Sequence, residues 1–462
     1  MSKKFLTDSF LYIIGDGLNK LAVFLLIPIY TSVFSVEEFG MLEMIVMATA
    51  LLTLLISFGS KTSFLRLIHE DGERKASVML FNISLLIIFL FLFITVTTFL
   101  FQDFINDLAG MELTLFLYFI FGYSAFLGFN ELSLVILRYD KKVITYVFFS
   151  FLKTMFEIGA ILFFVLYLKN GVIGKVEGSL ISSVAMFLIL FKLVIWKNIE
   201  FNLDLSYLKV FFVYSTPIVF HQLIGWILVS YDKLILAQSF SIRDLGVFAL
   251  GMQLLMIFKY FLEASLKALN VEIFSNPDII KKYLFDIILL VLSLSAIAGL
   301  SLILFADYLI LLVANKNYLD SAMVLDYMTI SRIVMIYNLI LVMVLYLYKD
   351  SKAVLASTMK GFFVMLVSSA ALIPQLNFLG AGLSALIVYS VIGYLLTKSV
   401  RRHVQFKIKT IFLIIPVLYA VVILISLMDV ELQYKWLFIV ASTFLLTKVN
   451  KKFILDMYFK GV

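Results

Sequence analysis

Residues 78–101 read VMLFNISLLIIFLFLFITVTTFLF, and no side chain in this stretch is charged. A helix of roughly 20 apolar residues is long enough to cross the hydrocarbon of a bilayer, which is about 30 Å thick. The rest of the chain has the same character, because 63% of its 462 residues are hydrophobic and only 15% are charged. Soluble domains carry about 45–50% apolar and about 25% charged residues. The composition therefore excludes a water-soluble globular protein and indicates an all-α protein that crosses a membrane many times.

Apolar segments of this length follow one another along the whole chain. The same length criterion predicts about 14 transmembrane helices. They are expected at residues 8–33, 39–60, 78–101, 112–137, 143–168, 176–196, 208–238, 245–267, 283–305, 319–348, 353–373, 379–397, 410–428 and 434–449. The connections between them are short, which leaves no room for a soluble catalytic domain on either side of the membrane.

Lysine and arginine gather in alternate connections between the predicted spans. One set of connections is rich in them, as at Arg74 and Lys75 or at Lys141 and Lys142. The opposite set holds only Lys169, Lys175, Arg243, Lys316 and Lys435. Basic loops stay on the cytoplasmic side of a membrane. We therefore expect both termini in the cytoplasm, which agrees with an even number of spans.

Motifs for enzymatic chemistry are missing from the sequence. The chain contains no cysteine, which excludes disulfides, thiolate metal sites and cysteine nucleophiles. It has no GxxxxGK(S/T) phosphate loop, no HExxH zinc pair and no GxSxG nucleophile elbow. Its histidines, His69, His221 and His403, have no metal-ligand spacing. We therefore expect no catalytic residue, no metal site and no ATP hydrolysis by this chain, which leaves secondary transport.

A short motif occurs twice in the sequence. Residues 34–40 read FSVEEFG and residues 240–246 read FSIRDLG, at an offset of 206 residues. A second match at the same offset pairs residues 173–174 (IG) with residues 379–380 (LG). Two matches at one offset indicate an internal duplication that covers most of six spans.

The duplication predicts how the chain is divided. We expect a six-helix lobe at 1–206, a second six-helix lobe at 207–405, and two extra helices with a tail at 406–462. Because six is an even number, both lobes start on the same side of the membrane and the repeat is parallel. Secondary transporters built from such repeats bind their substrate between the halves, near the bilayer midplane.

Four stretches of the chain carry a family resemblance. The stretches GDGLNK at 15–20, LLIPIYT at 25–31, EFG at 38–40 and YDKLIL at 231–236 resemble the first, second and seventh helices of Wzx-type polysaccharide flippases. Those flippases belong to the multidrug/oligosaccharidyl-lipid/polysaccharide (MOP) exporter superfamily, together with the lipid II flippases and the MATE drug exporters. The topology of the whole chain agrees with this resemblance.

The resemblance implies a two-lobed transporter of the bacterial cytoplasmic (inner) membrane. The implied substrate is an undecaprenyl-pyrophosphate-linked oligosaccharide, moved from the inner to the outer leaflet for assembly of O-antigen, capsule or another surface glycan. A polysaccharide polymerase and a chain-length regulator are implied partners besides the lipid bilayer, and no nucleic acid is expected. No cofactor is expected either, because a proton or sodium gradient would drive transport.

Several basic residues lie near the midpoint of a predicted span. They are Lys20, Lys153, Lys259, Arg332 and Lys360. A charge at this depth costs about 2.5–3.5 kcal/mol on insertion scales and above about 10 kcal/mol in simulations. These side chains must therefore face protein or water, and their common depth predicts one shared cationic cavity. Because arginine binds phosphate through two parallel hydrogen bonds and lysine acts as a point charge, we interpret all of them as candidate ligands of a pyrophosphate.

A different interpretation stays open for the lysines that have an acid four residues away. These pairs are Asp16 with Lys20, Lys153 with Glu157, and Lys259 with Glu263. Residues at this spacing share one helix face, so the pairs could merely neutralise each other and hold the helix packing. Arg332 and Lys360 have no acid within four residues, which favours a ligand role for both.

The same acids are candidates for coupling transport to an ion gradient. The candidate coupling residues are Asp16, Glu157, Glu263 and His221. Histidine is included because its titration range suits proton transfer, although a packing role is equally open to it. Glu43, Glu131 and Asp232 lie nearer the ends of predicted spans, where we expect their carboxylates to reach interfacial water.

Two other functions remain open beside the leading hypothesis of a lipid-linked oligosaccharide flippase, which is not an enzyme. A MATE-like exporter of small cationic molecules belongs to the same fold, but its cargo would prefer an acidic cavity. A membrane-embedded glycan polymerase or ligase would usually need a large external loop to order its donor and acceptor. The short external connections of this chain argue against that enzyme.

Overall fold

The chain forms two compact units, Met1–Ser230 (unit 1) and Tyr231–Val462 (unit 2). The computed structural model describes residues 17, 19, 22, 24–71, 73–103, 114–256 and 278–404. The predicted spans 410–428 and 434–449, half of 8–33 and the second half of 245–267 lie outside the described residues.

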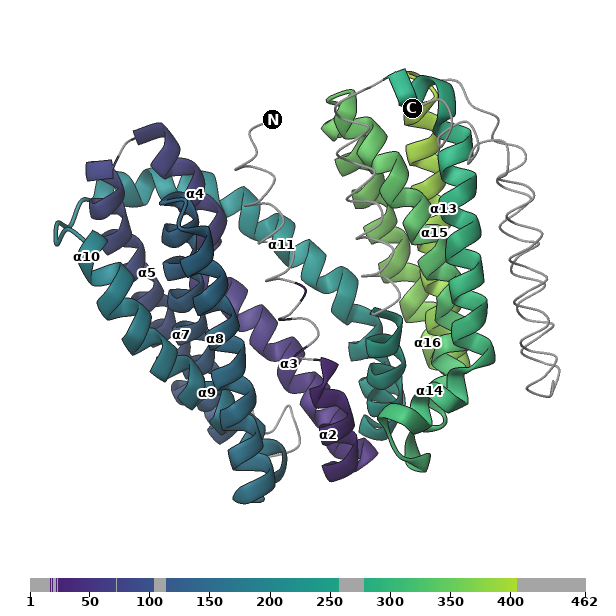
Figure 1. Cartoon of the computed structure of the whole chain (residues 1–462), viewed down its shortest axis with the longest axis horizontal. Coiled ribbons are helices and arrows are strands. Elements are labelled where there is room, and N and C mark those ends of the chain that lie inside the picture. Colours follow the sequence, from purple (N-terminus) through teal and green to yellow (C-terminus); the bar gives the residue numbers. More distant parts are fainter. Residues whose placement is uncertain are drawn as a thin grey trace. The chain divides into compact units, whose positions relative to one another are not determined.

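Every regular element within the described residues is a helix (Figure 1). Unit 1 contains α2 (Leu26–Val33), α3 (Val36–Ser57), α4 (Ser60–Asp71), α5 (Glu73–Leu100), α7 (Thr114–Tyr139), α8 (Val143–Leu162), the π-helix η1 (Phe163–Tyr167), α9 (Gly171–Leu190), the π-helix η2 (Phe191–Ile195) and α10 (Trp196–Asn198). Helix α11 (Leu205–Ser239) begins in unit 1 and ends in unit 2. Unit 2 continues with α13 (Asp278–Leu304), α14 (Ala306–Val313), the 3₁₀ helix η3 (Lys316–Tyr318), α15 (Ser321–Leu347) and α16 (Ser351–Val400).

The lengths of these helices agree with a protein that crosses the membrane many times. Nine of the described helices are long and apolar enough to span a bilayer. Helix α16 accounts for two predicted spans, 353–373 and 379–397, because its 50 residues are interrupted at Asn377, whose φ of 51° and ψ of −127° are not helical. The prediction of an all-α polytopic fold is confirmed.

The repeated FSxxxxG motif begins a helix in each unit. In unit 1, Ser35 Oγ accepts a hydrogen bond from the Glu38 N–H at 3.2 Å, and Glu38 Oε2 accepts one from the Ser35 N–H at 2.8 Å. This reciprocal capping box satisfies two backbone donors at the start of α3. In unit 2, Ser241 Oγ accepts the corresponding bond from the Asp244 N–H at 3.1 Å. The motif is therefore a capping signal that both units use.

The second repeated pair marks a tight hairpin in each unit. A Cβ added to Gly174 would lie 2.9 Å from a carbonyl oxygen of the preceding helix, and one added to Gly380 would lie 2.3 Å from such an oxygen. Shortly before them, Gly171 and Asn377 both have left-handed backbone, with φ of 58° and 51°. Left-handed residues turn the chain, and glycine lets the two helices approach closely. The units therefore share a hairpin at corresponding positions of the repeat.

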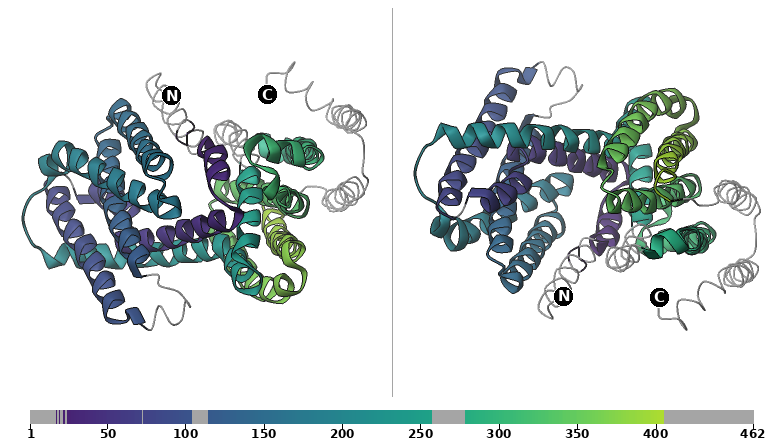
Figure 2. Two further views of the ribbon diagram at one scale, coloured as in Figure 1. Left: turned by 90° about the horizontal axis from the view of Figure 1, so that it is seen from below. Right: turned by 90° about the horizontal axis from the view of Figure 1, so that it is seen from above.

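Each unit is built around one largely buried helix. In unit 1, α7 contacts α3, α5, α8 and α9, and Leu132 and Ile136 of α7 are fully or almost fully buried. In unit 2, α15 lies between α13 and α16, and its Ile336 and Tyr337 belong to the apolar core (Figures 1 and 2). A charged side chain on α7 or α15 must therefore find its partner inside the unit.

The boundary between the units lies within α11. The first half of this helix belongs to unit 1, because Phe211 is part of the apolar core there and Ser215 Oγ donates a hydrogen bond to Ser63 Oγ at 2.7 Å. Further along, Trp226 Nε1 donates to the carbonyl oxygen of Met47 at 3.1 Å. The lobe boundary predicted from the repeat, at residue 206, lies at the start of the same helix.

Candidate functional site

Glu131 of α7 joins two lysines that come from two other helices. Lys61 Nζ lies 2.6 Å from Glu131 Oε2, and Lys153 Nζ lies 2.7 Å from Glu131 Oε1. Lys61 stands in the first turn of α4, and Lys153 lies on α8. Each oxygen of the carboxylate therefore accepts a hydrogen bond from one ammonium group.

This network differs from one expectation from the sequence. Lys153 forms its ion pair with Glu131 on a neighbouring helix rather than with Glu157 on its own helix. The physical reason is the central place of α7, whose side chains meet the helices packed around it.

Glu157, a predicted coupling residue, lies in a second polar group of unit 1. Its Oε1 accepts hydrogen bonds from Tyr123 Oη at 2.9 Å and from Ser179 Oγ at 3.2 Å. Lys175 Nζ lies 5.8 Å from the centroid of the Tyr123 ring, and this lysine is only 9% exposed. The sequence assigned Lys175 to an external connection, but α9 already begins at Gly171. This group therefore holds a carboxylate, a phenol and an ammonium group inside the unit.

Sequence reasoning missed most members of these two groups. The missed residues are Lys61, Tyr123, Glu131, Lys175 and Ser179. One signal was present, because the span that contains Glu131 also carries the small or polar residues Gly122, Ser124, Asn130 and Ser133. Small and polar residues within a span are typical of a helix inside a bundle. A charge on such a helix is expected to have an internal partner.

Arg332 of α15 lies among neutral groups in unit 2. Its Nη1 donates a hydrogen bond to Tyr389 Oη at 3.2 Å, and its Nη2 lies 3.5 Å from Met252 Sδ. The guanidinium carbon lies 5.9 Å from the centroid of the Tyr389 ring. No carboxylate among the described residues forms an ion pair with Arg332. The charge of Asp232 interacts with it at longer range, so an anion could still contact the guanidinium directly.

The other predicted site residues have fewer contacts or lie outside the described residues. Lys360 on α16 and His221 on α11 are exposed, and neither forms a hydrogen bond or an ion pair within the described part of the chain. Lys20, Lys259, Asp16 and Glu263 lie outside the described residues.

Asp232 forms an oxygen-rich cluster in unit 2, together with three serines of α16. Asp232 Oδ1 accepts a hydrogen bond from Ser369 Oγ at 2.6 Å. Ser384 Oγ lies 2.8 Å from Ser369 Oγ and 2.7 Å from Ser368 Oγ. A carboxylate with several hydroxyl oxygens suits a hard cation. This cluster could not be predicted from the sequence, because its members come from three separate stretches.

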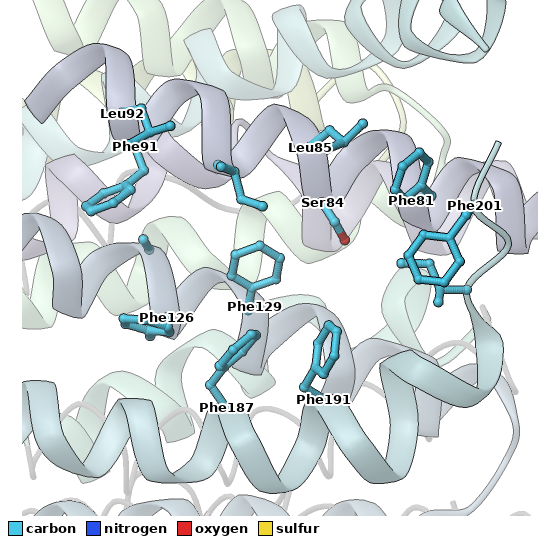
Figure 3. A pocket seen from close by; sticks show the side chains of 13 residues that line it. Phe81, Ser84, Leu85, Phe91, Leu92, Phe126, Phe129, Phe187, Phe191 and Phe201 are labelled. Carbon is cyan, nitrogen blue, oxygen red and sulfur yellow. The ribbon is translucent and has the colours of Figure 1, made fainter. Parts of the chain in front are cut away.

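An apolar cavity of about 370 Å³ lies between α5, α7 and the end of α9 in unit 1. Figure 3 shows Phe129, Phe187 and Phe191 turned toward it. Its lining is Phe81, Ser84, Leu85, Ile88, Phe91, Leu92, Ala125, Phe126, Phe129, Phe187, Phe191, Ile199 and Phe201. A lining with so few polar groups can accept a hydrocarbon chain but offers no group for acid–base chemistry. Among the residues that the structure describes, no cluster of histidine or acidic side chains could hold a metal ion either.

Long apolar helices, a duplicated helix start and hairpin, and charges inside each unit define a polytopic α-helical membrane protein with an internal repeat. The structure is similar to the lipid II flippase MurJ in an inward closed conformation, with a TM-score of 0.75 over 97% of this chain and 99% of that chain, at 14% identity. It is also similar to an inward-facing multidrug resistance MATE family transporter of the MOP superfamily, with a TM-score of 0.66 over 83% of this chain and 95% of that chain, at 16% identity.

The sequence gives the family. Residues 5–275 match the family described as polysaccharide biosynthesis protein, and the chain belongs to that family. A protein of the Lsg locus of Haemophilus influenzae is 22% identical over 273 residues, which are 58% of this chain and 65% of that relative. The match therefore spans less than two thirds of that relative's length.

Proposed function

We propose that this chain is a flippase that moves an undecaprenyl-pyrophosphate-linked oligosaccharide from the inner to the outer leaflet of the bacterial cytoplasmic membrane. Two findings support a lipid-linked cargo: the family is described as polysaccharide biosynthesis protein, and a similar structure is described as a lipid II flippase. The transported unit would serve the assembly of O-antigen, capsule or another surface glycan, with a polymerase and a chain-length regulator as partners. Both termini would lie in the cytoplasm.

The observation that carries this proposal is the environment of Arg332. A permanent charge within a membrane span is by default a sign of function. The direct contacts of Arg332 are a phenol and thioether sulfurs, and the charge of Asp232 interacts with it without forming an ion pair. A diphosphate supplies the pair of anionic oxygens that a guanidinium binds best. Lys360 would add positive charge within unit 2 and Lys153 within unit 1, and Lys20 and Lys259 are proposed to do so on the sequence alone.

Coupling to a proton or sodium gradient would supply the free energy for transport. The Asp232 cluster is a candidate for this role, because its carboxylate and hydroxyl oxygens could bind a proton or a hard cation in competition with the charges of Lys233 and Arg332, which interact with it. Glu157 and His221 remain candidates, and Asp16 and Glu263 are candidates on the sequence alone.

Export of a small organic cation, as by a MATE-like transporter, is less well supported. A cationic cargo would be repelled by Arg332, whose described partners carry no negative charge. A glycan polymerase or ligase would usually need a large external loop to order its donor and acceptor, and the predicted external connections of this chain are short.

A flipping assay in proteoliposomes tests the proposal. The full-length chain is reconstituted with a lipid-linked oligosaccharide whose fluorescent headgroup can be quenched only from outside the vesicle. We expect the quenchable fraction to change with time only when a proton or sodium gradient is imposed. Uptake of a cationic dye without headgroup movement would favour the exporter instead, and lengthening of the glycan would favour the polymerase.

A further inference from the structure

The carboxylate of Glu131 has the binding arrangement expected of a bound anion. Its two oxygens receive two ammonium groups, at 2.6 Å from Lys61 and 2.7 Å from Lys153. The two oxygens of a carboxylate are separated by nearly the same distance as two oxygens of a phosphate group. A phosphate could therefore accept the same two ammonium groups in place of Glu131.

The backbone holds Lys61 in position for this contact. Helix α3 ends at Phe58 and Gly59, whose φ values of 44° and 69° are both left-handed. These residues turn the chain into α4, so that Lys61 stands in the first turn of that helix. Lys61 also belongs to the connections predicted to face the cytoplasm, the side from which a lipid-linked substrate would enter.

Both lysines could contact an additional anion. The two ammonium groups share the carboxylate of Glu131, and Lys153 also interacts at longer range with the charge of Glu157. Neither lysine has another hydrogen bond or ion pair within the described residues. Exposure falls along the group, from 52% for the Lys61 side chain to 17% for the Lys153 side chain. An anion that arrives from outside therefore meets Lys61 first and can then reach Lys153.

We propose that Glu131 is an internal substitute for the substrate: it occupies Lys61 and Lys153 until the diphosphate of the lipid-linked substrate displaces it. The three residues then form an anion-exchange site. This inference rests on the proposed function, from which the identity of the diphosphate comes.

The exchange has a physical reason in both directions. Without substrate, removal of Glu131 would leave Lys153, whose side chain is only 17% exposed, without its ion-pair partner, which is unfavourable. With substrate, a diphosphate carries more negative charge than one carboxylate and makes stronger charge-assisted hydrogen bonds. Glu131 therefore stabilises the substrate-free unit. Because it competes with the diphosphate for Lys61 and Lys153, it also lowers their affinity for the substrate, which can then dissociate.

Binding of inorganic pyrophosphate to the full-length protein in detergent tests this inference. Glu131→Gln keeps the shape of the side chain and removes its charge, so the dissociation constant for pyrophosphate should fall by about fivefold or more, as for removal of a competing ligand. The double variant Glu131→Gln with Lys153→Gln should lose this gain. Glu177→Gln is the matched control, because Glu177 lies in the same unit and accepts only from Asn170 Nδ2. Its dissociation constant should equal that of the unchanged protein.

An unchanged or higher dissociation constant in Glu131→Gln would overturn the inference, because a purely structural ion pair predicts that result. If Glu131→Gln does not fold, Glu131→Asp takes its place. The shorter side chain of aspartate is not expected to reach both lysines, so pyrophosphate should again bind more tightly. Binding no tighter than in the unchanged protein would overturn the inference.

The flipping assay separates this inference from the proposed function. If the unchanged protein flips a lipid-linked oligosaccharide and Glu131→Gln binds pyrophosphate no more tightly, the exchange role is wrong and the function stands. If no lipid-linked oligosaccharide is flipped but the gain in Glu131→Gln and its loss in the double variant are observed, the anion-exchange site stands and the function is wrong.

Discussion

Arg332 and Tyr389 contact each other in two ways: Arg332 Nη1 donates a hydrogen bond to Tyr389 Oη at 3.2 Å, and the guanidinium carbon lies 5.9 Å from the centroid of the tyrosine ring. The backbone of Tyr389 is itself held, because its carbonyl oxygen accepts a hydrogen bond from Asn338 Nδ2 at 2.8 Å. Tyrosine thus fixes the position of the guanidinium without neutralising it, which is what a binding site for an anion requires.

The hydroxyl of Tyr389 is predicted to orient Arg332 for binding. Tyr389→Phe keeps the ring and removes the hydrogen-bond acceptor, so the KM for lipid-linked substrate should rise about fivefold with little change in kcat, equivalent to about 1 kcal/mol of binding. Tyr394→Phe is the control, because Tyr394 lies on the same helix and is exposed. An effect of equal size in both variants would argue against a specific role for Tyr389.

The two hairpin glycines are predicted to be required for stability. Gly174→Ala and Gly380→Ala would each force a Cβ against a carbonyl oxygen and should lower the free energy of unfolding by about 1–3 kcal/mol. Gly159→Ala and Gly225→Ala are controls, since a Cβ at either position meets nothing within 4 Å. Thermal unfolding in detergent should show a lower Tm for the first two variants only. Equal Tm values in all four variants would mean that the two helices of each hairpin are not closely packed at the glycine.

The Asp232 cluster is predicted to couple transport to the ion gradient. Asp232→Asn retains a hydrogen-bonding group for Ser369 but removes the negative charge that would attract a cation. We expect this variant to lose its response to imposed proton and sodium gradients while it still binds the substrate. Asp307→Asn, at an exposed position of α14, should respond normally. Gradient-dependent flipping by Asp232→Asn would assign the coupling to another residue.

The polyprenyl tail is predicted to stay in lipid beside the protein, because each buried CH₂ group is worth about 0.8 kcal/mol and a cationic interior cannot receive it. The last two predicted spans, 410–428 and 434–449, are the expected contact, and a photoreactive polyprenyl probe should label them. Truncation after Lys407 should then reduce flipping. Labelling confined to the apolar cavity around Phe187 would instead assign the tail to unit 1.

Hydropathy predicted the fold well, because the bilayer fixes both the length and the composition of a spanning helix. The predicted span 319–348 and the observed α15 (Ser321–Leu347) differ by only a few residues. The repeat was also informative, since the capping serines Ser35 and Ser241 carry a local signal that needs no neighbouring helix. Hydropathy was weaker at helix ends, where it left Lys175 in a connection although the residue lies within α9.

The site was harder to predict than the fold, because ion pairs in a bundle form between helices. The i,i+4 spacing places Lys153 and Glu157 on one face of α8, yet it does not reveal that Glu131 of α7 lies opposite Lys153 at 2.7 Å. Rotation of one helix against another depends on packing of all the side chains between them. Arg332 was easier to single out, because a base without a nearby acid is unusual inside a span.

Headgroup flipping by the double variant Arg332→Ala with Lys360→Ala tests whether cationic residues inside the protein hold the diphosphate. The assay uses proteoliposomes with equal amounts of folded protein, and Lys352→Ala, an exposed position on the same helix as Lys360, serves as the control. We predict that the double variant loses flipping and that the control flips normally. Arg332→Lys should retain only part of the activity, because it keeps the positive charge but loses the bidentate geometry. Normal flipping by the double variant would contradict the proposed role of these residues.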